Sequence, residues 1–246
     1  MIRDEERNGV RLLRMQLGSG NALGTRAVQA ITGALEAEQR PTVLTGDGGI
    51  FSAGLNLVEL ASFSRTEIAA FIDEFSVLMA RALTTRYPLV AAVNGHAVAG
   101  GCVLAMACDR RIGTRGDFKI GMNEMAIGLT LPAVVTEILR DKLASEQART
   151  VILGGALYEP GKAQLAGLLD AVADSSDEAI DQACEVALDL GKSPTEFAAM
   201  KGSLTAPIME RFQQTRTALD RRFIDSWFAP PATELREKML ARLQTR

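Results

Sequence analysis

The chain has 246 residues, of which 47% are hydrophobic and 23% charged, a composition typical of soluble globular proteins rather than disordered or fibrous ones. Its 27 basic and 30 acidic residues leave a formal net charge of −3, so we expect no nucleic-acid partner. The single histidine, His96, excludes a site built from several histidines, and we expect no metal. The three cysteines, Cys102, Cys108 and Cys184, form no CxxC pair and predict reduced thiols in the cytoplasm.

The N-terminal half of the sequence alternates predicted strands with predicted helices. Residues 1–7 are charged and precede no long apolar stretch, so we expect no signal peptide. Apolar residues recur at three- and four-residue steps between Ser64 and Thr84, and Ser64 with Glu67 fits a capping box, which predicts a helix that begins there. The elements before it are predicted as a strand at residues 10–17, a helix at 26–37 and a strand at 42–45. Strands separated by helices require crossover connections and therefore predict a mostly parallel sheet.

The segment from Leu89 to Cys108 carries no formal charge and is long enough to cross a membrane. Two pairs, Asn94-Gly95 and Gly100-Gly101, break it into a strand, a turn and an apolar helix, as in a buried strand-loop-helix unit. We therefore expect no membrane span here.

The second half of the chain is mostly helical. Two strand candidates come first, at residues 110–114 and 118–120. From Pro132 onward helical periodicity dominates, and helices are predicted at residues 145–153, 177–190, 194–212 and 233–243. Because no linker or repeat separates the halves, we expect one α/β core at residues 1–190, followed by a C-terminal helical region at residues 191–246.

Two glycine-containing segments follow predicted strands. Residues 45–57 are too long and too rich in glycine for a hairpin turn, which fits either a backbone close to a ligand or a surface loop that needs positive φ. They match neither a P-loop nor a dinucleotide-binding fingerprint. Residues 94–103 connect a buried strand to the N-terminus of an apolar helix. The free N–H groups at a helix N-terminus can bind negative charge that develops on an oxygen atom. For His96 in this second segment, local hydrogen bonding is favoured over catalysis, since no nearby Ser or Cys supplies a nucleophile.

A third segment, residues 120–132, places the carboxyl of Glu124 among apolar residues. If this site is buried, desolvation raises the pKa of Glu124 and makes it a better proton acceptor and donor near neutral pH. Taken alone, the segment also fits a solvated loop glutamate, which is the commoner case.

Together the three segments resemble the crotonase (enoyl-CoA hydratase/isomerase) superfamily. The resemblance rests on FSAGLNL at residues 51–57, AAVNGHAVAGGCVLAMACD at 91–109 and KIGMNEMAIGL at 119–129, in this order and spacing. An early NAL turn at residues 21–23 and a GLLD segment at 167–170 extend it over most of the chain. Within the superfamily, the sequence most resembles the monofunctional Δ3,Δ2-enoyl-CoA isomerases of fatty-acid metabolism.

The resemblance implies an α/β fold, a crotonase-like spiral of ββα units with a helical C-terminal region. In such proteins the C-terminal helices build trimers, so residues 191–246 are expected to form a trimerisation region and the protein a homotrimer or a dimer of trimers. The implied partner is an acyl-CoA thioester substrate. No cofactor is implied, because coenzyme A is part of the substrate and the thioester is itself the electron sink.

The family's site residues transfer to matching positions of this sequence. The two oxyanion-hole N–H groups correspond to Leu55 and Gly100, and Ala53 and Gly54 belong to the same substrate-binding loop. Asn56 stands where the family usually has Asp, which puts a loop contact in doubt but no chemistry.

The family's hydratases use two glutamates, and this sequence matches only one of them. The first position is Val103, which is expected to line the substrate site, and the second is Glu124. Hydration needs a group that activates water as well as one that handles a proton, whereas a 1,3-proton shift needs a single base. The sequence therefore favours an isomerase that moves the double bond of 3-enoyl-CoA to give 2-enoyl-CoA, with Glu124 as its catalytic residue.

Two alternatives stay open at this point. Another crotonase-type enzyme, a hydratase, decarboxylase or thioester hydrolase, could use the same oxyanion hole. The chain could also be a non-catalytic acyl-CoA-binding subunit, which the presence of Glu124 argues against. Lys201 fits a solvated lysine better than a contact to a CoA phosphate.

Overall fold

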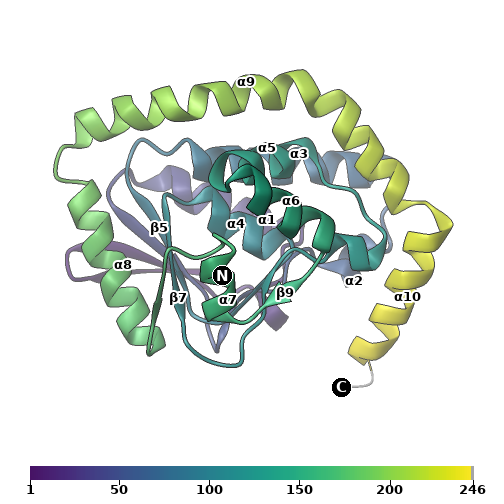
Figure 1. The fold of residues 1–246 in the computed structure, drawn as a ribbon, viewed down its shortest axis with the longest axis horizontal. Helices are drawn as coiled ribbons and strands as arrows, with labels where there is room; N and C mark the ends of the chain where they lie inside the picture. Colours follow the sequence, from purple (N-terminus) through teal and green to yellow (C-terminus); the bar gives the residue numbers. More distant parts are fainter. Residues whose placement is uncertain (245–246) are drawn as a thin grey trace.

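A six-stranded sheet lies at the centre of the fold (Figure 1). The computed structural model describes residues 1–244, so the last two residues of the predicted C-terminal region lie outside the described residues. The strand order is β1-β2-β3-β5-β7-β10, and only β1 pairs antiparallel with its neighbour, which confirms the predicted mostly parallel sheet. The strands are β1 (Ile2–Arg7), β2 (Val10–Met15), β3 (Thr42–Thr45), β5 (Leu89–Val93), β7 (Arg110–Thr114) and β10 (Ala171–Ala173).

A second, smaller sheet carries the loops of the site. Its order is β4-β6-β8-β9, with strands β4 (Ile50–Ser52), β6 (His96–Val98), β8 (Ile120–Gly121) and β9 (Leu157–Tyr158). The strand predicted at residues 118–120 is the short β8, shifted toward the C-terminus. Parallel pairing of β4 with β6, and of β6 with β8, brings the ends of all three predicted segments to one place.

The N-terminal half contains the three predicted helices and two short ones that were not predicted. The predicted helices are α1 (Thr25–Ala37), α3 (Arg65–Leu83) and α4 (Gly100–Ala107), and the short ones are α2 (Leu57–Leu60) and η1 (Ser19–Asn21). The capping box of Ser64 and Glu67 is confirmed at the start of α3. The apolar face of this helix packs into the main hydrophobic core, which also contains all side chains of α4 beyond its two glycines.

The uncharged run at residues 89–108 forms β5, β6 and α4, which confirms the predicted strand and helix. The predicted turn between them also contains the short strand β6, which pairs with β4 and β8. Every residue of α4 is buried inside the protein. Among the described helices, none combines the length and the apolar character that a membrane crossing requires.

The helices of the second half wrap around this core. They are η2 (Glu124–Ile127), α5 (Ala133–Lys142), α6 (Ser145–Gly154), α7 (Pro160–Leu165), α8 (Ser176–Leu190), α9 (Pro194–Trp227) and α10 (Pro230–Gln244). Helix α8 packs on the large sheet over a second apolar cluster. Helix α9 arches over α3 and α5, and α10 descends from its end beside η2 and α2 (Figure 1).

The prediction that the helix after Pro194 ends at Phe212 was wrong. Helix α9 continues through Pro207 to Trp227. A proline inside a helix removes one backbone hydrogen bond and strains the preceding turn. Burial of Ile208, Phe212 and Phe223 against the core offsets this loss, because each aromatic side chain removes a large apolar area from water.

Candidate active site

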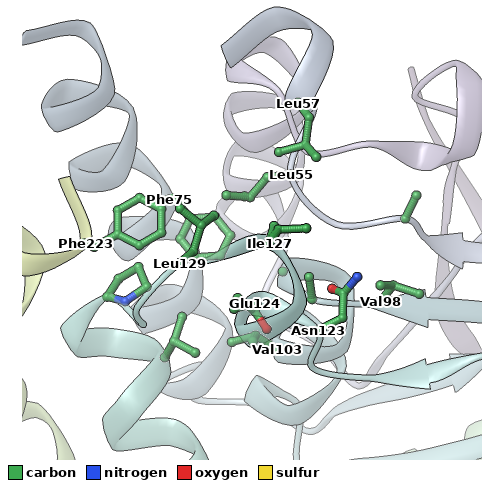
Figure 2. A pocket seen from close by; sticks show the side chains of 15 residues that line it. Leu55, Leu57, Phe75, Val98, Val103, Asn123, Glu124, Ile127, Leu129 and Phe223 are labelled. Atoms are coloured by element: carbon green, nitrogen blue, oxygen red, sulfur yellow. The ribbon is translucent and has the colours of Figure 1, made fainter. Parts of the chain in front are cut away.

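A pocket with about 580 Å³ of empty space lies where the three predicted segments meet (Figure 2). The loop after β4 contributes Ala53 and Leu55, and α4 contributes Gly100 and Val103. Glu124 enters it from η2. The other lining side chains are Leu57, Phe75, Val98, Ala99, Asn123, Ile127, Leu129, Pro132, Val135 and Phe223. The walls are therefore almost entirely apolar, as in pockets that bind hydrocarbon groups.

The backbone of Leu55 presents a free N–H group to this pocket. The Leu23 N–H donates to the Gly54 carbonyl oxygen (2.8 Å), and the Asn56 N–H donates to the Leu23 carbonyl oxygen (3.1 Å). Because both bonds lie on one side of the segment, the N–H of Leu55 between them points to the opposite side. Among residues 1–244, no protein group accepts a hydrogen bond from it.

A second N–H group without an acceptor among the described residues belongs to Gly100, the first residue of α4. The first N–H groups of a helix have no carbonyl partner within that helix. Ala99 before it adopts φ 50° and ψ −122°, an uncommon conformation that turns the chain sharply from β6 into the helix. The Ala99 N–H donates to the Gly121 carbonyl oxygen (2.8 Å), which ties this turn to the loop that carries Glu124.

Gly54 allows the two N–H groups to lie close together. Its φ is +88°, and a Cβ atom added there would lie 2.6 Å from the Val98 carbonyl oxygen and 3.3 Å from the Gly100 nitrogen. Any larger residue would push the two loops apart. The structure thus places Leu55 and Gly100 next to each other in the lining of one pocket.

The carboxyl of Glu124 has little contact with solvent. The residue as a whole is half-buried, but its Oε2 atom is inaccessible and has no hydrogen-bond partner among the described residues. Burial raises the pKa of the Glu124 carboxyl to about 7, because its effect exceeds the opposing effect of the backbone N–H groups of Glu124 and Asn123. At neutral pH this group can therefore both accept and donate a proton.

Glu124 is the one titratable side chain that lines the pocket in the described part of the chain. Val103 is fully buried in α4 and presents only methyl groups (Figure 2). Asn123 supplies the other polar side chain, and it does not exchange protons at neutral pH. The pocket thus offers one acid/base group beside two backbone donors.

Two other sequence candidates have local structural roles. The Lys119 N–H donates to Nδ1 of His96 (3.0 Å), and the imidazole packs edge-on against Phe118, so the predicted local hydrogen bonding is confirmed. Asn56 caps α2, where its side chain accepts a hydrogen bond from the Glu59 N–H (3.3 Å). The carboxamide therefore makes a capping contact at this loop position.

The expectation that Lys201 is solvated was wrong. Its side chain is only 7% exposed, and Nζ donates to Asp109 (2.8 Å) and to the Thr85 hydroxyl (2.7 Å). Burial lowers the pKa of this lysine, and the Asp109 carboxylate opposes the change. Because the inward face of α9 carries it toward the core, Lys201 anchors the helix and is not free to bind a phosphate.

Sequence reasoning missed the aromatic residues of the pocket. Phe75 stands on the predicted apolar face of α3, where nothing in the pattern separates a pocket residue from a core residue. Phe223 lies beyond the predicted end of the long helix.

Among the described residues, no group of three or more His, Cys, Asp or Glu side chains is arranged to hold a metal ion.

Comparison with known proteins shows which family this sequence matches. The sequence profile of the enoyl-CoA hydratase/isomerase family matches residues 5–241. Mitochondrial enoyl-CoA delta isomerase 1 of Mus musculus is 29% identical over 179 residues, which cover 70% of this chain and 62% of the mouse protein. The 2,3-dehydroadipyl-CoA hydratase of Escherichia coli is 31% identical over 191 residues, covering 75% of this chain and 73% of that enzyme. Matches to the mitochondrial isomerases span less than two-thirds of those proteins' own length.

Among solved structures, human mitochondrial Δ3-Δ2-enoyl-CoA isomerase shares the fold with a TM-score of 0.92. That match covers 99% of this chain and 98% of the human chain at 24% identity. The α/β crotonase fold, with two sheets and a long C-terminal helix, is therefore confirmed. Isomerases and hydratases match the sequence at comparable identity.

Proposed function

The chain belongs to the enoyl-CoA hydratase/isomerase family, and from this premise we propose that it is an enoyl-CoA isomerase. Its substrate is a 3-enoyl-CoA thioester and its product the conjugated 2-enoyl-CoA. The observation that carries the proposal is the presence of a single proton-exchanging side chain, Glu124, in an otherwise apolar pocket.

The N–H groups of Leu55 and Gly100 form the oxyanion hole. Both donate to the thioester carbonyl oxygen, which gains negative charge when the α-carbon loses a proton. Fixed donors stabilise this charge without reorganising, and one such donor contributes roughly 10²–10³ to the rate. The N-terminus of α4 adds the positive end of a helix dipole behind Gly100.

Glu124 carries the proton between two carbon atoms. Its carboxylate removes a proton from the α-carbon, and the electrons of that C–H bond move toward the thioester carbonyl. The resulting dienolate collapses as the Glu124 carboxyl returns the proton to the γ-carbon, which leaves the double bond between the α- and β-carbons. A pKa of about 7 suits both halves of this transfer, because neither protonation state is strongly favoured near neutral pH. No net proton is gained or lost, and no metal or redox cofactor is required.

Val103 distinguishes this reaction from hydration. Adding water across the 2-enoyl double bond requires a group that orients and deprotonates the water while another group protonates the α-carbon. The buried methyl groups of Val103 do neither. Hydratases remain the second candidate because hydratase relatives match the sequence as well as isomerases do.

The test is to incubate the protein separately with 3-enoyl-CoA and with 2-enoyl-CoA and to separate the products by chromatography. An isomerase converts the first into 2-enoyl-CoA and leaves the second with almost no 3-hydroxyacyl-CoA. Rapid formation of 3-hydroxyacyl-CoA from 2-enoyl-CoA would overturn the proposal in favour of a hydratase. Binding of both thioesters without conversion would identify a non-catalytic acyl-CoA-binding subunit.

We also propose that the C-terminal helices at residues 191–246 assemble the chain into a homotrimer or a dimer of trimers. Two apolar side chains on α9, Met200 and Leu204, are 67% and 74% exposed in the single chain, as expected for a helix that contacts another subunit. Light scattering should give three or six times the 26.4 kDa subunit mass.

The three buried, unpaired cysteines support a reducing compartment, for which we propose the cytoplasm.

A further inference from the structure

The pocket is open at one end and closed at the other. Ala53 is exposed and Val98 is half-buried, whereas Phe75 and Phe223 are each only 2% exposed. Figure 2 shows the two phenylalanines to one side of Glu124 and Val98 to the other. A large, charged coenzyme A moiety therefore stays at the end with Ala53 and Val98, and an attached acyl chain extends past Glu124 toward the aromatic rings.

Phe75 and Phe223 come from different helices and face the same closed end. Phe75 belongs to α3, and its ring lies 3.5 Å from the position that a Cβ atom on Gly100 would occupy, so this ring borders the oxyanion hole. Phe223 belongs to α9 and lies farther from the mouth, beside Leu129. Phe75 thus covers the start of the acyl path, and Phe223 stands at its end.

The Phe223 ring packs against further buried side chains. The Trp227 ring lies 6.1 Å from the Phe223 ring at a tilt of 38°, and Trp227 is only 1% exposed. On Trp227 lies the Arg236 guanidinium of α10, 4.2 Å from the ring centroid. This packing restricts the Phe223 ring, because a close-packed interior leaves little room for a side chain to move.

We propose that Phe223 sets the maximum length of the acyl chain. The inference rests on the proposed function only in placing the acyl group of a thioester in this pocket. Each methylene added before the ring is reached is buried among apolar side chains and strengthens binding about fourfold. A methylene beyond that limit must displace a buried aromatic ring, which costs more than the burial of one methylene contributes.

The experiment is titration calorimetry with saturated acyl-CoA thioesters of increasing even chain length, which cannot be isomerised. For the wild type, the affinity should rise about fourfold per methylene and then stop rising or fall at one chain length. Phe223→Ala should move this limit to chains longer by about two to four carbon atoms, the size of the removed ring. Phe223→Leu should move it less and retains more of the packing.

Phe212→Ala is the matched control. Phe212 is also on α9 and only 4% exposed, but it lies outside the pocket, with the Arg216 guanidinium over its ring. This variant should keep the wild-type limit. The proposal is overturned if folded Phe223→Ala and Phe223→Leu both keep that limit, if Phe212→Ala shifts it equally, or if wild-type affinity rises to the longest chain without a break. A shifted limit in a protein that lacks isomerase activity would reject the proposed reaction and retain the role of Phe223.

Discussion

Replacing Glu124 by glutamine tests both the proposed chemistry and the burial of this carboxyl. Glu124→Gln keeps the size of the side chain and removes its ability to exchange a proton. General acid/base groups typically contribute 10²–10⁴ to a rate, so isomerase turnover should fall by roughly that factor. The affinity for a saturated acyl-CoA should change little, because the oxyanion hole and the apolar walls remain in place.

The same substitution should stabilise the protein at alkaline pH. Burial raises the pKa of Glu124 from 4.5 to about 7. Below about pH 4 the carboxyl is protonated in both the folded and the unfolded chain, so its pKa shift has no effect on stability. Between pH 4.5 and 7 the unfolded chain releases this proton first, so the free energy of unfolding falls as the pH rises, by about 3 kcal/mol above pH 7. Glutamine does not titrate and escapes this loss.

Urea unfolding of wild type and Glu124→Gln at pH 5 and pH 8 measures the effect directly. The stability of the variant relative to the wild type should be about 2–3 kcal/mol higher at pH 8 than at pH 5. Glu185→Gln, at an exposed position of α8, is the control and should show no such pH-dependent difference. Equal pH dependence of Glu124→Gln and wild type would refute the burial argument, and near-wild-type turnover would refute the proton shuttle.

Three further substitutions test other parts of the structure. Gly100→Pro deletes one oxyanion donor and should lower turnover at least 10²–10³-fold. Gly100→Ala keeps the N–H and is the control. Equal rates of folded Gly100→Pro and Gly100→Ala would contradict the role of this donor. Val103→Glu should increase 3-hydroxyacyl-CoA formation from 2-enoyl-CoA at a cost of about 1–3 kcal/mol or more in stability, with Val103→Gln as the control that gains no hydration. Lys201→Met leaves the Asp109 carboxylate buried without its cation and should cost about 3–5 kcal/mol in urea unfolding, against less than about 1 kcal/mol for the exposed Lys192→Met.

The sequence predicts the parts of the site that depend on local chain geometry. The helix from Ser64 was recognised because its capping box and apolar spacing are local signals. The strand β5 and the helix α4 were recognised because glycine pairs interrupt an apolar run. The resemblance to a family identified Leu55, Gly100 and Glu124, and the structure brings all three to one pocket. Their proposed roles remain predictions.

Features that depend on tertiary packing could not be predicted in this way. The short strands β4, β6 and β9, which were not predicted, have two or three residues each, too few for a periodic pattern. The extension of α9 past Pro207 depends on apolar contacts along its whole length. The burial of Lys201 depends on a carboxylate 92 residues earlier in the chain. Each of these outcomes is decided by residues that are distant in sequence.

Because α9 comes late in the sequence, the residue proposed to limit acyl-chain length is synthesised after the residues proposed to react. During synthesis from the N-terminus, the residues that are proposed to stabilise the enolate and move the proton are all made by Glu124, whereas Phe223 is added about a hundred residues later. A nascent chain that ends before α9 therefore contains every reacting group of the proposed mechanism but lacks Phe223. Chemistry and size selection are thus encoded in different parts of the polypeptide, so mutations in α9 can change which chains are accepted without altering the residues that react.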